Sequence, residues 1–379
     1  MSWDFVKFSD LFDYENKSKI KAGNGLPLGQ YPFYTSSNEL SKYLNEYLFD
    51  KSSLIFGTGG NASIHYCNKP FAVSTDCLVA FPKDHKIVEP KFVYYYLLGN
   101  INLLENGFKG AGLKHISKGY INDLLIPLPP LATQKRIAEI LDAADALKRK
   151  DQQLLKKYDE LAQAIFIDMF GDPVKNEKGW EVKKLGEYIA FIGDIGSNGS
   201  NAVVAKNLKM FDTEDYAIMI RTTNLAANDF KNRIKYISKD TYEFYSKSKI
   251  WGGEIIMNKI GSAGDFWIMP KLNKPVSLGL NQFVIRLSNL NTKFIFYYLS
   301  SDYGRKQIKS NLNGAVTKSI TKSAVKGLPL YYPPIELQNR FEEIIEKIEL
   351  LKWKFSSNKE TGFLFENLIQ KAFNGELVN

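Results

Sequence analysis

Two short motifs in the first half of the chain combine residue types that could do chemistry. Gly57-Thr-Gly-Gly60 is glycine-rich like a phosphate-binding loop, but it lacks the lysine that such a loop requires. Glu89-Pro-Lys91 has the carboxylate and lysine of many nuclease sites, but no acidic partner upstream completes the set. We therefore interpret the first motif as a tight turn and the second as the start of a helix.

The histidines and cysteines could support a second kind of chemistry, but their spacing argues against it. His65, His85 and His115 all lie in the first half of the chain, and the only cysteines are Cys67 and Cys77. This spacing matches no known zinc site, and two cysteines are too few for a disulfide framework. The two Pro-Pro pairs also lack the preceding Asp or Asn of an amino-methyltransferase motif. The sequence therefore predicts no catalytic residue, no metal and no cofactor.

The composition is that of a globular protein with more than one domain. The 379 residues are 44% hydrophobic and 13% aromatic, which is enough to build two or three cores. No apolar run approaches the ~18 residues of a membrane-spanning helix. The start of the chain also lacks the pattern of a signal peptide. We expect a reduced, cytoplasmic protein that has no membrane partner.

The positive charge of the chain is concentrated in one segment. The formal net charge is +9, and residues 171–334 contribute 24 basic and 14 acidic residues, a net of +10. Residues 1–130 contain 13 lysines, no arginine and 12 acids, a net of only +1. A phosphate backbone is a plausible target for such a basic segment. We expect the second half of the chain to contribute more phosphate affinity than the first.

The chain repeats itself at about half its length. Trp3-Asp-Phe-Val-Lys-Phe-Ser-Asp10 recurs 177 residues later as Trp180-Glu-Val-Lys-Lys-Leu-Gly-Glu187. Later matches, 201 to 204 residues apart, pair 54–60 with 255–261, 91–97 with 293–299, and 110–117 with 314–321. The growth of the offset from 177 to 201 places 24 additional residues in the second copy, mostly between Phe191 and Lys249. The ordered matches indicate two copies of one unit, with additional loops in the second.

Each copy contains a β-rich domain followed by a long helix. Short β-type runs such as Ser53-Leu-Ile-Phe56 alternate with glycine-rich turns, and Pro129-Pro130 marks the boundary to the helix. We predict an α/β (α+β) protein in which two repeated β-rich domains are separated by two long antiparallel coiled-coil-like helices. The predicted domains are residues 1–130 and 171–334, and the predicted helices are 131–170 and 335–379.

Both helices carry an apolar stripe with alternating spacings of three and four residues. Its members are Ile137, Ile140, Ala144, Leu147, Leu154, Tyr158, Leu161 and Ile165, then Phe341, Ile344, Ile348, Leu351, Phe355, Phe365, Ile369 and Ala372. We predict that the stripes pair with each other, although they could instead face the globular domains. The interruptions at Asp151, Asn358 and Gly362 either fix the register or mark a local break.

Several of these motifs resemble those of the DNA-specificity subunit of type I restriction–modification systems. The similarity lies in the tryptophan opening of each half and in Leu128-Pro-Pro-Leu-Ala-Thr-Gln134, which begins the first helix and recurs at Tyr332–Gln338. It extends to the junction Ala164–Pro173 and the closing run Leu368–Leu377. The resemblance covers essentially the whole chain.

The resemblance implies a non-catalytic subunit that binds double-stranded DNA. In that family the two globular domains are target-recognition domains, and each reads one half of a split recognition site. The two helices set the spacing between the half-sites and bind two methyltransferase (modification) subunits, which a restriction/translocase subunit joins. Alternatives are the specificity subunit of a methylation-only or combined restriction–modification system, and a coiled-coil adaptor that does not bind DNA.

Under this interpretation, polar residues that match between the copies are candidates for contacts to bases. In the first domain they are Thr35, Ser36, Ser37, Asn38, Thr58, Asn61, Lys114 and His115. In the second they are Arg221, Thr222, Thr223, Asn224, Asn258, Lys259, Ser262, Thr317 and Lys318. The alternative for each is ordinary turn capping. Candidates for contacts to phosphates are Lys109, Lys206, Lys209, Lys231, Arg233, Lys247, Lys249 and Lys322, with solvated surface lysine as the alternative.

Overall fold

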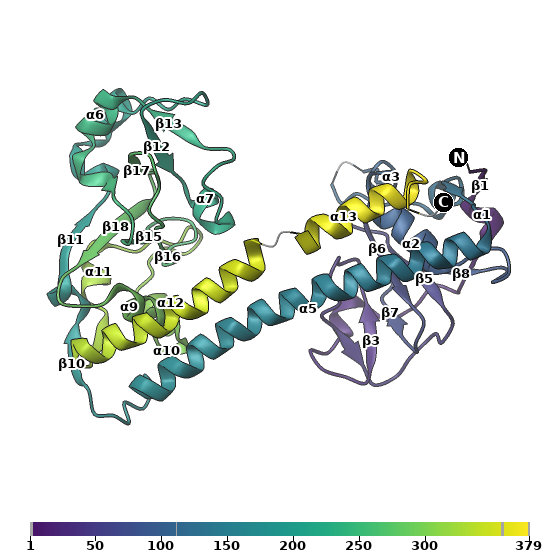
Figure 1. Ribbon diagram of the computed structural model, residues 1–379, viewed down its shortest axis with the longest axis horizontal. Helices are drawn as coiled ribbons and strands as arrows, with labels where there is room; N and C mark the ends of the chain where they lie inside the picture. The colour runs from purple at the N-terminus through teal and green to yellow at the C-terminus, as the bar shows by residue number, and fades with distance from the viewer. Residues whose placement is uncertain (1–2, 111, 358–359, 378–379) are drawn as a thin grey trace. The chain divides into compact units, whose positions relative to one another are not determined.

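The computed structural model describes residues 3–110, 112–357 and 360–377 (Figure 1). The chain forms two compact units. Unit 1 contains Met1–Leu154 and Phe355–Asn379, and unit 2 contains Leu155–Lys354. Each unit therefore combines a sheet-containing part with portions of the long helices.

The described residues of unit 1 form a four-stranded, a three-stranded and a two-stranded sheet. Its strands are β1 (Phe5–Lys7), β2 (Phe12–Tyr14), β3 (Tyr31–Tyr34), β4 (Tyr43–Leu44), β5 (Ser53–Gly57), β6 (Ser63–Cys67), β7 (Ala72–Val73), β8 (Cys77–Pro82) and β9 (Leu125–Pro127). Its shorter helices are α1 (Phe8–Leu11), η1 (Ala22–Asn24), α2 (Pro90–Gly99), α3 (Asn102–Glu105) and α4 (Lys118–Asn122). The strand orders are β2-β8-β5-β6, β4-β3-β7 and β1-β9, and β3 pairs with β7 in parallel.

Unit 2 repeats these sheets with longer connections. Its strands are β10 (Glu181–Lys184), β11 (Ile189–Gly193), β12 (Ala217–Ile220), β13 (Lys235–Ile237), β14 (Lys249–Ile250), β15 (Ile255–Asn258), β16 (Phe266–Ile268), β17 (Val276–Leu278), β18 (Gln282–Leu287) and β19 (Pro329–Tyr332). Its shorter helices are η2 (Leu185–Tyr188), η3 (Ile195–Asn198), α6 (Asn201–Asn207), α7 (Thr222–Ala227), α8 (Lys239–Phe244), η4 (Ser246–Ser248), α9 (Thr292–Ser300), α10 (Asp302–Ser310) and α11 (Lys322–Lys326).

The strand orders of the two units correspond one to one. β11-β18-β15-β16 matches β2-β8-β5-β6, and β10-β19 matches β1-β9. β13-β12-β17 matches β4-β3-β7 and keeps the parallel pair, with β14 added at the edge. The repeat in the sequence is therefore a repeat in topology, and α6, α7 and α8 lie in the segment where the second copy has additional residues.

β5 and β15 are matching inner strands of the β2-β8-β5-β6 and β11-β18-β15-β16 sheets, and both are buried on both faces. In β5, Leu54 and Phe56 belong to the core that includes α2, whereas Ile55 packs with Phe71 on the other face. In β15, Ile255 and Met257 face the helices in the same way, and Ile256 packs on the β13-β12-β17-β14 sheet. Successive side chains of a strand point to opposite faces, so these apolar runs join two cores.

The long helices run antiparallel. α5 (Leu131–Phe170) begins against α13 (Glu360–Phe373) in unit 1, where Ile137 and Leu141 share a core with Ile369. It ends against α12 (Ile335–Ser357) in unit 2, where the rings of Phe166 and Phe341 lie 5.6 Å apart. Because the start of α5 packs on the last helix and its end packs on α12, the predicted antiparallel arrangement is confirmed.

The apolar stripes differ in detail from the prediction. Leu147 and Leu161 are exposed, whereas Leu141, Ala162 and Phe166, which the stripe omitted, are buried. The helices pack on the sheet-containing parts as well as on each other, so the buried face is wider than a coiled-coil seam. Of the predicted interruptions, Asp151 is partly exposed, Gly362 lies within α13, and Asn358 lies outside the described residues.

Candidate nucleic-acid interface

Three segments of unit 1 that were expected to face a ligand lie together. We call them loop cluster 1: residues 35–38 after β3, 58–61 after β5, and the hairpin residues 109–110 and 112–115. The main-chain N–H of Gly60 donates to the carbonyl of Lys114 at 3.1 Å, and that of Ile116 donates to Thr58 at 3.1 Å. These bonds hold the hairpin against the turn that follows β5.

Some polar side chains of loop cluster 1 support its backbone, and others are exposed. The hydroxyls of Ser36 and Thr58 both donate to the carbonyl of Asp76, at 2.8 and 3.0 Å. The hydroxyls of Thr35 and Ser37 accept from main-chain N–H groups two residues later, which is ordinary turn capping. The side chains at the surface are those of Ser37, Asn38, Asn61, Lys109, Lys114 and His115.

Unit 2 contains the same arrangement, which we call loop cluster 2: residues 221–224, 258–262 and 313–319. The N–H of Gly261 donates to the carbonyl of Lys318 at 3.1 Å, as Gly60 does to Lys114. The N–H of Lys259 donates to Asn281 at 2.8 Å, as Thr58 does to Asp76 at the same distance. Matched hydrogen bonds therefore build both clusters.

Two asparagines expected at the surface of loop cluster 2 are buried. Asn258 accepts from the Thr222 hydroxyl at 2.8 Å and donates to Ser262 at 3.2 Å. Asn224 accepts from the N–H of Arg221 at 3.2 Å and donates to the carbonyl of Asn232. Their amides therefore position the loop, and the base contacts expected of them stay a prediction. Thr223, Ser262, Thr317 and Lys318 are exposed, and Arg221 and Thr222 are half-buried.

Three lysines expected to bind ligand or phosphate are engaged within unit 2. Lys259 and Lys322 donate to the buried carboxylate of Asp194 at 2.7 and 2.8 Å, and their side chains are only 18% and 34% exposed. Lys249 pairs with Glu243. Asp194 follows β11 at the start of the additional loops, so it ties the insertion to the repeated core. These lysines are therefore engaged within the protein, whereas Lys206, Lys209, Lys231 and Arg233 are exposed. Lys247 is also exposed, and its Nζ donates to the carbonyl of Ser197 at 3.0 Å.

The buried carboxyl of Asp194 is ionised in the folded protein. Burial alone would raise the pKa of its carboxyl, but hydrogen bonds from Lys259, Lys322 and Ser197 outweigh burial and lower it to about 2. A folded-state pKa below the ordinary 3.8 means that the ionised carboxylate stabilises the fold above about pH 4. This contribution is lost as the pH falls towards 2.

Replacing Asp194 with Asn should lower the free energy of unfolding by about 2 kcal/mol at pH 7, because two partly buried ammonium groups lose their counter-charge. Urea unfolding at pH 7 and pH 3 measures this difference, which should be smaller at pH 3 because the carboxyl of the unfolded chain, with its ordinary pKa of 3.8, is then mostly protonated. Asp212→Asn removes a carboxylate whose side chain is 83% exposed beside Lys235, and it should change stability by less than about 0.5 kcal/mol. If the two substitutions lowered the free energy of unfolding equally, Asp194 would not hold the additional loops to the repeated core.

The family model of the type I restriction modification DNA specificity domain matches residues 1–157 and 177–360. The chain belongs to this family. The two matched ranges follow the two copies of the repeat, and the predicted family and fold class are confirmed. As a member of the DNA specificity family, the chain supplies sequence specificity and not catalysis.

Curated relatives of this specificity subunit match it over most of their length. It is 23% identical over 380 residues to the MjaVIII type I restriction enzyme specificity subunit of Methanocaldococcus jannaschii, covering 92% of this chain and 86% of the relative. It is 24% identical over 419 residues to the EcoBI specificity subunit of Escherichia coli, covering 100% of this chain and 86% of the relative. The crystal structure of the S subunit from M. genitalium has the same fold, with a TM-score of 0.61 and 15% identity over 98% of this chain and 96% of the other.

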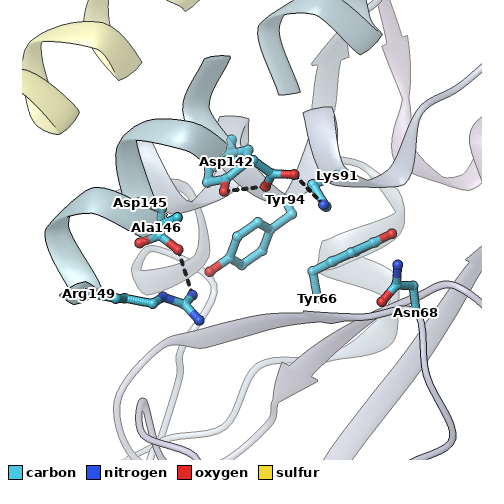
Figure 2. Close-up of a pocket in the computed structure, with 9 residues that line it drawn as sticks. Tyr66, Asn68, Lys91, Tyr94, Asp142, Asp145, Ala146 and Arg149 are labelled. Atoms are coloured by element: carbon cyan, nitrogen blue, oxygen red, sulfur yellow. Dashed lines mark hydrogen bonds and ion pairs between the residues drawn. The ribbon is translucent and has the colours of Figure 1, made fainter. Parts of the chain in front are cut away.

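A polar cavity of about 410 Å³ lies where α5 of the specificity subunit packs on α2 and β6 in unit 1 (Figure 2). Lys91 forms an ion pair with Asp142, and the Tyr95 hydroxyl donates to the same carboxylate at 2.7 Å. Asp145 and Arg149 form a second pair along α5 at 2.6 Å. Unit 2 has a counterpart of the first pair, Lys293 with Glu349 of α12. Because the charged side chains that line the cavity are paired with one another, we interpret it as part of the packing contact between α5 and the sheet-containing part of unit 1.

The cysteines and histidines of the specificity subunit are placed as structural residues. Cys67 and Cys77 are buried free thiols, and burial raises the pKa of Cys77 to about 11. The part of the chain that the structure describes has no group of three or more His, Cys, Asp or Glu side chains placed to hold a metal ion. Within the same residues, no helix is both long and apolar enough to cross a membrane.

The sequence motifs did not reveal all the residues that shape the interface. Asp194 has no charged partner nearby in the sequence, since Lys259 and Lys322 lie 65 and 128 residues away. Gln134 and Gln338 recur in the motif that begins each long helix, and both are buried. Their recurrence was visible in the sequence, but their hydrogen-bond partners were not.

Proposed function

We propose that this specificity subunit reads a split site in double-stranded DNA, with loop cluster 1 at one half-site and loop cluster 2 at the other. The observation that carries the proposal is the repetition of one loop arrangement, with matched hydrogen bonds, at the same topological place in both units. Residues 1–130 and 171–334 then act as the two target-recognition domains. Side chains exposed on both clusters are the candidates for base contacts.

The exposed cations support unequal contributions to phosphate binding. Lys206, Lys209, Lys231, Arg233 and Lys247 are exposed in unit 2, within the segment of net charge +10. Loop cluster 1 offers Lys109 and Lys114. Phosphate contacts position a protein on DNA without specifying sequence, and each contact releases counterions from the DNA, which adds to the salt dependence of binding. Unit 2 therefore provides most of the electrostatic affinity.

The long helices connect the two recognition elements and provide the surface for other subunits. A continuous helix of 40 residues is about 60 Å long at 1.5 Å per residue, whereas one turn of DNA is about 35 Å. Leu147, Leu161 and Leu350 remain exposed along α5 and α12 and could contact partner proteins. We assign this surface to two methyltransferase subunits, which a restriction/translocase subunit joins, and we place the assembly in the cytoplasm.

Methylome mapping of cells with and without the chain tests this function. We expect a bipartite methylated motif that disappears when the chain is removed, and a methyltransferase that co-purifies with it. The purified complex should bind a duplex containing the motif, and its affinity should fall as salt rises. Duplex binding that is absent, or that does not depend on salt, would instead favour the coiled-coil adaptor.

A further inference from the structure

Loop cluster 2 borders a cavity of about 240 Å³ at the end of β12. Its walls combine the apolar side chains of Met210 and Leu280 with Arg221 of the cluster and the backbone of Gly279. β12 and β17 are the parallel pair of the β13-β12-β17-β14 sheet, so the cavity lies where two parallel strands end. The cavity is lined in part by loop cluster 2, which we propose to lie at the second half-site.

Arg221 is held in this cavity with a donor left over. Its Nη2 donates to the carbonyl of Arg233, and its main-chain N–H donates to Asn224 at 3.2 Å. Among the described residues, its Nε is buried and has no hydrogen-bond partner. An unpaired buried N–H destabilises the protein, and a ligand that brings an acceptor relieves this cost. A guanidinium has only donors, so the ligand must present acceptors.

The remainder of the cavity is apolar and shaped by a close backbone approach. The N–H of Gly279 donates to the carbonyl of Ile220 at 2.7 Å, and a Cβ at Gly279 would lie 2.8 Å from that oxygen. Any larger residue would therefore displace the cavity wall. Met210 and Leu280 are 44% and 46% exposed, although both are large apolar side chains. An apolar surface beside a fixed guanidinium fits a ligand with an acceptor edge next to a methyl group.

Building on the function proposed above, we propose that this cavity reads a guanine and a neighbouring thymine in the second half-site. Arg221 donates to O6 and N7 of the guanine, the base edge that presents two acceptors in the major groove. Met210 and Leu280 contact the 5-methyl group of the thymine, the apolar group on that edge of DNA. A phosphate would satisfy the guanidinium, but it would leave the apolar side chains facing water.

The matching place in unit 1 has different chemistry. Thr35 stands where unit 2 has Arg221. Asp76 and Asn281 accept equivalent main-chain bonds, which aligns Thr75 with Leu280. Neither of these two positions carries a guanidinium or a leucine, so we expect the first half-site to be read by other contacts. The first half-site therefore serves as an internal control whenever binding or methylation of the whole target is measured.

The experiment uses the full chain in complex with its methyltransferase subunits. In cells carrying Arg221→Lys, methylome mapping should show that one guanine of the second half-site is no longer required, while the first half-site is unchanged. On the wild-type duplex, this variant should lose about 10- to 100-fold in affinity. Leu280→Asn should relax the neighbouring thymine in the same half-site. Thr35→Ser is the matched control and should alter neither of these positions.

Modified bases test the contacts on the wild-type complex, so that folding of a variant is not in question. A scan with 7-deazaguanine should find one position in the second half-site where loss of N7 weakens binding about tenfold, and Arg221→Lys should no longer respond there. Deoxyuridine for the neighbouring thymine should weaken binding about three- to fourfold, because one methyl group is lost.

Two outcomes would overturn the cavity's assignment while leaving the proposed function intact. One is specific duplex binding that is insensitive to 7-deazaguanine across the second half-site. The other is an Arg221→Lys defect that disappears when a neutral methylphosphonate replaces one backbone phosphate, which would make Arg221 a phosphate contact. A wild-type complex that binds no duplex at all would refute the proposed function itself.

Discussion

Duplicating residues 147–153 of α5 together with residues 348–354 of α12 should lengthen the unread spacer of the DNA target and leave both half-sites unchanged. Seven residues add about 10.5 Å of helix, which corresponds to up to about three base pairs when the helix follows the DNA axis. Seven residues are also close to two full turns, so each apolar face shifts by only about 20°. Methylome mapping of the variant gives the new spacer directly.

The central part of α5 is the place where such an insertion should be tolerated. Between positions 145 and 161, all of which the structure describes, no side chain is buried. The buried residues lie towards the ends, such as Leu141 in unit 1 and Phe166 in unit 2. A variant with residues 147–153 permuted, and no change in length, is the control and should keep the original spacer. Altered half-sites with a constant spacer would contradict the spacing role of the helices.

The two-copy architecture was predictable from the sequence because each copy contains the same short motifs in the same order. The tryptophan openings precede β1 and β10, and the Leu-Pro-Pro and Tyr-Pro-Pro runs precede α5 and α12. Strand identity also followed from local patterning, since the apolar runs at Leu54 and Ile255 became the doubly buried strands β5 and β15. Signals of this kind act over a few residues, so a sequence alone carries them.

The placement of single side chains was less predictable, because it depends on contacts between distant segments. Lys259 and Lys322 look like free cations in the sequence, but Asp194 in the additional loops of the second copy binds both. Asn258 ends a strand near the proposed interface, yet Thr222 and Ser262 close over it. Periodicity similarly predicted which helix faces are apolar, but not that the sheet-containing parts would share those faces.

The two buried glutamines show how one repeated residue can set a joint. Gln134 donates to the carbonyls of Pro129 and Ile87 at 2.8 and 3.1 Å, and it accepts from the N–H of Glu89 at 2.9 Å. Gln338 donates to Pro333 at 2.8 Å and accepts from Asn291 at 2.9 Å. Each side chain thus ties the first turn of a long helix to the segment that begins a helix of the adjoining domain.

Replacing Gln134 with Leu should therefore lower the free energy of unfolding of unit 1 by about 3 kcal/mol, because three buried backbone groups lose their partner without a compensating one. Gln338→Leu leaves only two groups unpaired and should cost about 2 kcal/mol in unit 2. Urea unfolding of the full chain measures both, with Lys135→Ala on the exposed face of the same helical turn as the control, expected to change stability by less than about 0.5 kcal/mol. If the glutamines serve mainly to fill space, leucine should do so equally well. Both variants would then have the same free energy of unfolding as Lys135→Ala.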